Sequence, residues 1–297
     1  MALSIRLIGV PMDLGQDLRG VDVGPSALRY TGLTRRLARL GHQVEDRGNL
    51  EVAVRGTLHD GKKGLSFVPQ IRETCERIYE EGRQAIADGC LPIFMGGDHS
   101  ISIGTVGGVT HDGPAGVLWI DAHGDYNTPE TSPSGNVHGM PLAVLRGLCV
   151  PELVNLGRPG PKLEPEDVML IALRDLDAME SELLRDSRMG IYTMREIDER
   201  GLAVVAREAL RRLHHHDRLH VSLDMDSIDP MFAPGVGTPV PGGLTNREAH
   251  LLMELVADDG RVGSVDIVEI NPLLDERNRT AQMAADLVMS LLGKSII

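Results

Sequence analysis

The sequence predicts one α/β domain in which a mainly parallel β-sheet lies between helices on both faces. The first observation is that short apolar runs alternate with amphipathic stretches along nearly the whole chain, a pattern typical of strands joined by crossover helices. The second is the composition, because 297 residues with 42% hydrophobic and 25% charged side chains suffice for one large core. No repeat, low-complexity tract or linker divides the chain, so we expect a single domain over residues 1–297.

Each predicted element follows from its local pattern. The run 91–95 is apolar throughout, as expected of a buried strand. The stretch 69–88 begins with Pro69 and spaces Ile71, Cys75 and Ile78 as an amphipathic helix does. By the same criteria, strands are expected at 4–10, 91–95, 116–120, 167–173, 219–223 and 264–270, and helices at 25–40, 69–88, 176–186, 202–213, 246–257 and 278–292. Polar stretches at 56–67, 129–136 and 155–165 predict surface loops.

Net charge and cysteine usage exclude several classes of partner. The formal net charge is −13, whereas nucleic-acid binding needs basic patches. No apolar run approaches the ~20 residues that span a bilayer, and the N-terminus lacks a signal-peptide pattern. Cys75, Cys90 and Cys149 show no paired spacing, which fits free thiols in a reducing compartment. We therefore expect a cytoplasmic protein that binds a small molecule and neither nucleic acid nor membrane.

Acidic residues and histidines gather where predicted strands end. They are His99, Asp121, His123, Asp125, Asp224, Asp226 and Glu269. Alternate residues of an extended chain share a face, so 121, 123 and 125 can point together, and so can 224 and 226. Open α/β sheets build their sites at the carboxyl ends of strands. Four aspartates this close would raise one another's pKa values unless cations lay between them, and the pattern therefore predicts a two-metal site.

An isolated strand-end aspartate is more often a turn former or a helix N-cap than a metal ligand. That explanation would have to cover DxHxD, DxD and GGDH motifs together, each at a strand end, and we reject it. Carboxylates with two imidazoles and no accompanying cysteine favour Mn²⁺ or a related ion over a structural zinc site. A pair of such ions can lower the pKa of a shared water enough to present hydroxide at neutral pH.

Two other histidine-containing stretches carry weaker signals. The loop 134–138 could donate hydrogen bonds to an anionic group, with His138 as a proton shuttle, although an isolated polar loop is more often an ordinary turn. His214, His215 and His216 end a predicted helix among arginines, and we expect a solvated surface there. GxGxxG, GK[ST] and GxSxG motifs are absent, which disfavours dinucleotide, P-loop and nucleophile-elbow sites.

Taken together, the motifs resemble those of the ureohydrolase family, and within it the arginase branch. The matching segments are 24–29, 96–100, 121–129, 134–139, 174–177, 222–230, 237–240 and 268–272, which span nearly the full length. The metal motifs are family-wide. The Ser-Gly-Asn-x-His-Gly loop at 134–139 is more discriminating, because it resembles the form that receives the α-carboxylate and α-amino group of an amino acid. The resemblance implies an arginase-like three-layer fold with one catalytic domain over residues 1–297.

The resemblance also implies a role for each matched residue. One Mn²⁺ would be held by His99, Asp121, Asp125 and Asp224, and a second by Asp121, His123, Asp224 and Asp226, with Asp121 and Asp224 as bridges. Substrate would be bound by Glu269 at the guanidinium, with Thr238 in the wall nearby, by Asn127, Ser134 and Asn136 at the α-carboxylate, and by Asp177 at the α-amino group. Asp125 would donate a proton and His138 would exchange it with bulk water. Tyr126 and the pair Met231 and Phe232 depart from the family pattern without touching a ligand position.

The implied reaction is hydrolysis of the L-arginine guanidinium to L-ornithine and urea by a hydroxide that bridges two Mn²⁺ ions. A guanidinium is a poor electrophile and stays protonated, so it needs a strong nucleophile at close range. An agmatinase or another guanidino or formimino hydrolase would share the metal site. A metal-dependent deacylase and a non-catalytic scaffold relative are more remote alternatives. Resemblance to bacterial members implies a homo-oligomer, either a trimer or a hexamer.

Overall fold

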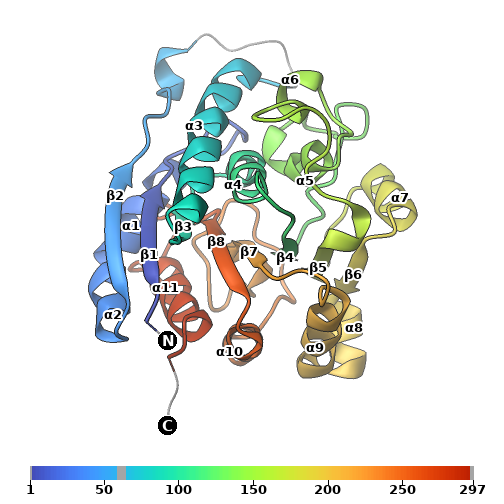
Figure 1. The fold of residues 1–297 in the computed structure, drawn as a ribbon. Coiled ribbons are helices and arrows are strands. Elements are labelled where there is room, and N and C mark those ends of the chain that lie inside the picture. The colour runs from blue at the N-terminus through green and yellow to red at the C-terminus, as the bar shows by residue number, and fades with distance from the viewer. Residues whose placement is uncertain (1, 59–64, 295–297) are drawn as a thin grey trace.

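The computed structural model describes residues 2–58 and 65–294 and confirms the predicted fold class (Figure 1). Eight strands form one sheet in the order β2-β1-β3-β8-β7-β4-β5-β6, and every strand pair is parallel. The strands are β1 (Ser4–Gly9), β2 (Gln43–Asn49), β3 (Leu91–Met95), β4 (Gly116–Ile120), β5 (Val168–Leu173), β6 (Gly190–Thr193), β7 (Leu219–Asp224) and β8 (Val262–Val268). All six predicted strands are therefore present, with small shifts at their ends.

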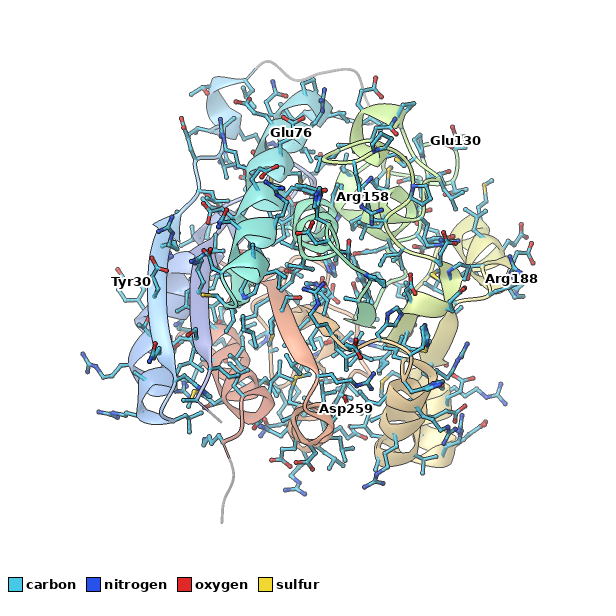
Figure 2. The ribbon with its side chains drawn as sticks, viewed as in Figure 1. Tyr30, Glu76, Glu130, Arg158, Arg188 and Asp259 are labelled. Atoms are coloured by element: carbon cyan, nitrogen blue, oxygen red, sulfur yellow. The ribbon has the colours of Figure 1, made fainter. Side chains whose placement is uncertain are left out.

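Helices cover both faces of the sheet (Figure 1). One layer contains α3 (Val68–Ala87), α4 (Ser102–Val109), α5 (Pro141–Leu145), α6 (Pro151–Val154) and α7 (Ala178–Asp186). The other contains α1 (Gly24–Tyr30), α2 (Leu33–Arg39), α8 (Met194–Arg200), α9 (Leu202–Arg212), α10 (Asn246–Asp259) and α11 (Arg279–Leu291). Alternate residues of a strand face opposite layers: Leu118 packs against the second layer and Trp119 against the first. Charged side chains such as Glu76 on α3 project outward from the periphery (Figure 2).

Two differences from the predicted helices have local causes. The helix expected at 25–40 is split into α1 and α2 at Gly32, whose φ of 74° is incompatible with a continuous right-handed helix. Helix α4 lies outside the predicted elements because three of its eight residues are glycines, which are poor helix formers. A Cβ at Gly104 would lie 2.6 Å from the carbonyl oxygen of Cys75, so glycine allows α4 to contact the backbone of α3.

The two edge strands, β2 and β6, also lie outside the predicted elements. The sequence of β2, QVEDRGN, is polar and largely exposed, so it lacks the apolar run that identifies a buried strand. The predicted loop at 56–67 falls partly outside the described residues. None of the described helices is long and apolar enough to span a bilayer.

Candidate metal centre and substrate cavity

The carboxyl ends of adjacent central strands bring the predicted site residues together. His99 follows β3, Asp121 follows β4, and Asp224 ends β7. Each aspartate closes a tight turn with a hydrogen bond to the backbone two residues later. Asp121 Oδ1 accepts the backbone N–H of His123 at 2.7 Å, and Asp224 Oδ1 accepts that of Asp226 at 2.8 Å. The Oδ2 atoms of Asp121 and Asp224 face His99, and that of Asp121 also accepts a hydrogen bond from the Trp119 indole N–H at 3.1 Å.

Six side chains meet at this edge, and we call them the carboxyl-edge cluster: His99, Asp121, His123, Asp125, Asp224 and Asp226. His99 Nδ1 lies 2.8 Å from Asp125 Oδ2, and 3.1 Å from Oδ2 of both Asp121 and Asp224. His123 Nδ1 lies 3.1 Å from Asp226 Oδ2 and 3.5 Å from Asp121 Oδ1. The cluster thus forms two adjacent groups that share Asp121, and each group has the composition of a cation site.

The donor atoms of the cluster fit divalent cations. His99 Nδ1 and Asp125 Oδ2 are buried and make no hydrogen bond to the described residues, although they lie 2.8 Å apart. Buried polar atoms are normally hydrogen-bonded, so an unpaired set that converges on one point indicates a missing partner. Carboxylate oxygens and imidazole nitrogens are the ligands that Mn²⁺ and related ions take in proteins.

Electrostatic repulsion within the cluster also indicates a cation site. Burial, followed by repulsion from Asp121, raises the pKa of Asp125 to about 6. Burial, followed by repulsion from Asp226 and Asp121, raises the pKa of Asp224 well above its usual value. Carboxylates whose charged forms are disfavoured in this way gain from cations placed between them.

A chain of buried hydroxyl groups fixes the orientation of His99. Its Nε2 lies 2.8 Å from Ser222 Oγ, which lies 3.4 Å from Ser102 Oγ, and Ser102 Oγ donates to Asp266 Oδ2 at 2.9 Å. Because the single hydroxyl proton of Ser102 is donated to Asp266, Ser102 can only accept from Ser222, and the protons along this chain point from His99 toward Asp266. His99 therefore donates through Nε2 and presents the Nδ1 lone pair to the cluster. The indole ring of Trp119 stacks on the imidazole at 4.3 Å and restricts its tilt.

Two of the predicted catalytic residues have unusual backbone conformations. Asp125 has a φ of 50° and Glu269 a φ of 61°, in the left-handed region that residues other than glycine rarely adopt. Backbone hydrogen bonds hold both, since Leu142 N–H donates to Asp125 O at 3.0 Å and Glu269 N–H donates to Gly97 O at 2.9 Å. Such local strain is concentrated at functional sites, where the surrounding structure maintains it.

Glu269 follows β8 and is 1% exposed. Its Oε1 accepts the backbone N–H of His99 at 2.9 Å and lies 3.1 Å from Nδ1 of His138. Its Oε2 accepts a hydrogen bond from the side-chain amide of Gln16 at 2.7 Å. Burial alone would lower the pKa of His138, but the Glu269 carboxylate outweighs burial and raises it to about 9.

A cavity of about 210 Å³ opens beside the carboxyl-edge cluster. Its lining includes every predicted site residue except Asp121, a member of the cluster that is 1% exposed. The predicted residues that line it are His99, His123, Asp125, Asn127, Ser134, Asn136, His138, Asp177, Asp224, Asp226, Thr238 and Glu269. Five other residues of the wall were not among the predicted site residues: Ser132, Gly139, Asp175, Leu176 and Glu180.

The residues expected to bind the amino-acid end of a substrate all line this cavity. Asn127 Nδ2 donates to Asp177 Oδ2 at 2.9 Å, and the backbone N–H of Asn136 donates to Ser134 Oγ at 3.2 Å. Thr238 Oγ1 donates to Asp226 Oδ2 at 2.9 Å, so its hydrogen bond goes to the cluster. The structure thus joins the 134–138 loop to Asp177, from a different part of the chain, around one cavity.

One expectation about the remaining histidines is wrong. His216 was expected on a solvated surface, but it is 4% exposed and its Nε2 lies 2.8 Å from Asp167 Oδ1. The residue pattern gave no signal for this pairing because Asp167 comes 49 positions earlier in the chain. Tyr126 is 3% exposed within the core, and neither it nor Phe232 lines the cavity.

Comparison with known proteins identifies the family. The model of the arginase family matches residues 3–293. Over 296 residues the chain is 48% identical to the arginase of Bacillus caldovelox, with 99% of each chain covered. The chain belongs to the arginase family. A solved structure of the native B. caldovelox arginase superposes with a TM-score of 0.96 at 47% identity, covering 99% of this chain and 100% of that one.

The arginase family also includes more distant relatives of the same shape. The arginase of Entamoeba histolytica, solved in complex with L-ornithine, is 30% identical and superposes with a TM-score of 0.90, covering 99% of this chain and 100% of that one. Membership of the arginase family confirms both the predicted family and the predicted sheet architecture.

Proposed function

We propose that this arginase-family chain hydrolyses the guanidinium group of L-arginine to L-ornithine and urea. The observation that carries the proposal is the position of Glu269, a buried carboxylate in the wall of the cavity that also exposes the carboxyl-edge cluster. A guanidinium held by Glu269 would place its carbon beside the cluster. The arginase of Bacillus caldovelox, which is 48% identical over 99% of each chain, supports the same reaction.

Glu269 is suited to bind a cation. Burial alone would raise its pKa, but the hydrogen bond and charge of His138, followed by the backbone N–H of His99, lower it below its usual value. The carboxylate is therefore ionised at neutral pH. A guanidinium is always charged and presents parallel N–H groups, so it pairs with a carboxylate in a defined plane. This pairing orients the substrate before reaction and lowers the entropic cost of the attack.

The metal would be two Mn²⁺ ions, one held by His99, Asp121, Asp125 and Asp224 and the other by Asp121, His123, Asp224 and Asp226. When bound, such a pair supplies Lewis-acid activation of a water at neutral pH. Asp125, at the inner end of the cavity, would give a proton to the departing amine nitrogen. His138 has the solvent-facing position needed to exchange that proton with bulk water, because its side chain is 18% exposed.

The other end of the cavity would select an α-amino acid. Asn127, Ser134 and Asn136 supply amide and hydroxyl donors for an α-carboxylate, and Asp177 supplies an acceptor for an α-ammonium group. Asn136→Ala and Asp177→Ala should each lower kcat/KM for L-arginine about tenfold, equivalent to about one lost hydrogen bond to a charged group. Both variants should keep their metal content.

The decisive experiment measures urea release from L-arginine and from agmatine, with chelator-treated and Mn²⁺-loaded protein. We expect rapid release from L-arginine in the loaded sample only. A preference for agmatine would overturn the substrate, and inactivity on both compounds would overturn the reaction.

The chain is further proposed to act in the cytoplasm as one catalytic domain over residues 1–297 that assembles into a trimer or a hexamer. Large apolar side chains that a single copy exposes support assembly, among them Tyr30 at 88% and Leu273 at 70% exposed. Tyr30 projects from the outside of the molecule in Figure 2. Light scattering of the purified protein tests the oligomer, and a monomeric mass would contradict it. Limited proteolysis tests the single domain.

A further inference from the structure

Gln16 is a buried residue of the site that no motif identified. It follows β1, is 3% exposed, and donates from Nε2 to Glu269 Oε2 at 2.7 Å. We propose that Gln16 is a positioning residue that fixes the Glu269 carboxylate for the guanidinium and thereby sets how tightly that group is bound. The inference rests on the proposed function, because it assumes that Glu269 receives a guanidinium.

The donors around Glu269 show what Gln16 contributes. An ionised carboxylate has about four lone-pair sites. Oε1 faces two donors, the backbone N–H of His99 and the ring of His138, and Oε2 faces Gln16. His138 is the one partly exposed side chain among these donors and is the one that an entering guanidinium would displace, whereas Gln16 and the His99 backbone are buried. With His138 withdrawn, one lone pair on each oxygen is available, which is what a bidentate guanidinium requires.

The chemical nature of Gln16 fits this role better than a charged residue would. A lysine or arginine at this position would neutralise the carboxylate and compete with the substrate cation. A carboxamide instead donates a hydrogen bond while it leaves the negative charge of Glu269 intact. Gln16 therefore restricts rotation of the carboxylate and preserves its attraction for a guanidinium.

The segment that carries Gln16 is itself tied to the other walls of the site. Gly15 N–H donates to the buried Asp98 Oδ2 at 2.8 Å, and Gly15 O accepts the backbone N–H of His138 at 3.0 Å. The guanidinium of Arg55 donates to the carbonyl oxygen of Gln16. The position of the Gln16 backbone is thus fixed independently of its side chain, so a substitution there should change the amide contact without moving the loop.

Gly237 provides the space in which the two side chains meet. A Cβ at this position would lie 3.0 Å from Gln16 Oε1 and 3.8 Å from Glu269 Oε2. The first distance is tighter than ordinary van der Waals contact, so an alanine would push the carboxamide away from its place beside Glu269. Gly237→Ala therefore perturbs the same contact from the opposite side.

The test compares Gln16→Met with wild type. Methionine keeps the length of the side chain and removes the N–H donor. We expect kcat/KM for L-arginine to fall about 10- to 100-fold, the range for losing a hydrogen bond to a charged group, with most of the change in KM. Calorimetric binding of free guanidinium ion to the Mn²⁺-loaded protein should weaken by a similar factor. Metal content and melting temperature should remain those of wild type, which a merely structural role would not predict.

Gln84→Met is the matched control. Gln84 is an exposed residue of α3 that makes the same kind of contact, from Nε2 to Asp88 Oδ1 at 2.7 Å, far from the cavity. It should leave KM and guanidinium binding unchanged. If Gln16→Met is poorly folded, Gly237→Ala provides a second test. It should raise KM for L-arginine and weaken guanidinium binding, but by a smaller factor than Gln16→Met.

The outcomes separate this inference from the proposed function. Wild-type KM and guanidinium binding in both Gln16→Met and Gly237→Ala would overturn the role of Gln16, while urea release by wild type would still support arginine hydrolysis. Absence of urea release by wild type would overturn arginine hydrolysis, and guanidinium binding that depends on Gln16 would still support the positioning role.

Discussion

At the carboxyl ends of β4 and β7, two histidines meet four aspartates, whereas at the amino ends of β5 and β7, His215 and His216 meet Asp167 alone. We call the second group the amino-edge group. Both groups contain the side chains from which metal sites are built, and both satisfy simple distance criteria for one. One group lies at the carboxyl ends of the strands and the other at their amino ends, so the two are on opposite sides of the same parallel sheet.

The two groups differ in how their polar atoms are satisfied. In the amino-edge group, Asp167 Oδ1 pairs with His216 Nε2 at 2.8 Å and Oδ2 accepts the backbone N–H of Glu164 at 2.7 Å. Each oxygen of the Asp167 carboxylate therefore has a partner, one an imidazole nitrogen and the other a backbone N–H. His216 Nδ1 is also buried without a hydrogen bond to the described residues, so an unpaired imidazole nitrogen occurs in both groups. Only the carboxyl-edge cluster also leaves a carboxylate oxygen, Asp125 Oδ2, without one, and there carboxylates outnumber imidazoles two to one. Excess buried carboxylate charge, more than the identity of the residues, is therefore what separates the candidate metal centre from the structural contact at Asp167.

The largest expected effect is that of Asp224→Asn. Loss of one carboxylate from the carboxyl-edge cluster should reduce bound metal below the proposed two ions per chain and lower urea release by on the order of a thousandfold or more, since the proposed metal pair would supply several kcal/mol of activation. Mass spectrometry of metal content and a urea assay measure both. Asp167→Asn is the control from the amino-edge group and should keep full metal content. Equal metal loss in the two variants would remove the distinction between the groups.

The second effect concerns pH, because the two edges contain histidines whose pKa values move in opposite directions. At the carboxyl edge, Glu269 outweighs burial and raises the pKa of His138 to about 9. At the amino edge, burial outweighs Asp167 and lowers the pKa of His216. Folded His138 therefore keeps a proton that the unfolded chain loses near pH 6.5, and folded His216 loses one that the unfolded chain keeps.

These signs predict opposite pH responses in metal-free protein. The stabilisation from His138 is complete below pH ~6.5 and is lost as pH rises through about 9, a change on the order of 3 kcal/mol in the free energy of unfolding. The contribution of His216 is present above pH ~6.5 and is lost as pH falls below it. Denaturant titrations of the unmodified chain and of His138→Asn from pH 5 to pH 10 check this. The difference between the two curves isolates His138 from His99 and His123, whose pKa values are also raised. A difference that stays constant between pH 6.5 and pH 9 would show that the Glu269 contact does not hold the proton.

The third effect tests the buried hydroxyl chain behind His99. Asp266→Asn adds donors where the chain needs an acceptor, so the tautomer of His99 is no longer enforced. We expect about 10- to 100-fold weaker binding of one metal ion, the range for partners behind a ligating histidine. Thr105 donates to the same Asp266 oxygen at 2.6 Å but lies outside the chain, so Thr105→Val should change affinity less. Calorimetric metal titration compares them, and equal losses would argue against a directional chain.

The same contrast explains what could be read from the sequence. Asp121, His123 and Asp125 lie within five residues of one another after an apolar run, and so do Asp224 and Asp226. Local spacing and the strand-end rule were enough to bring these residues to one edge. The cavity residues 134–138 could be placed only through the family resemblance, because a polar loop has no periodicity that fixes its position.

Residues whose role depends on a distant partner could not be predicted. The Gln16 to Glu269 contact joins positions 253 residues apart, and Ser102 meets Asp266 across 164. Neither Gln16 nor Asp266 belongs to a motif, and a buried serine or aspartate within a strand region has no distinctive pattern. Such contacts follow from the strand order β1-β3-β8-β7, which the local patterns leave open.

The smallest effect is expected in the amino-edge group itself. His216→Ala removes a buried ring and leaves Asp167 Oδ1 without its partner, which should lower the free energy of unfolding by about 2 kcal/mol. His215→Ala removes a side chain that is 40% exposed and lies 3.9 Å from the same oxygen, so its effect should stay within about 0.5 kcal/mol. Both variants should keep wild-type metal content, as measured beside their unfolding curves. If His215→Ala instead lost a bound ion, His215, His216 and Asp167 would be metal ligands. Excess carboxylate charge would then not be what distinguishes the carboxyl-edge cluster from the amino-edge group.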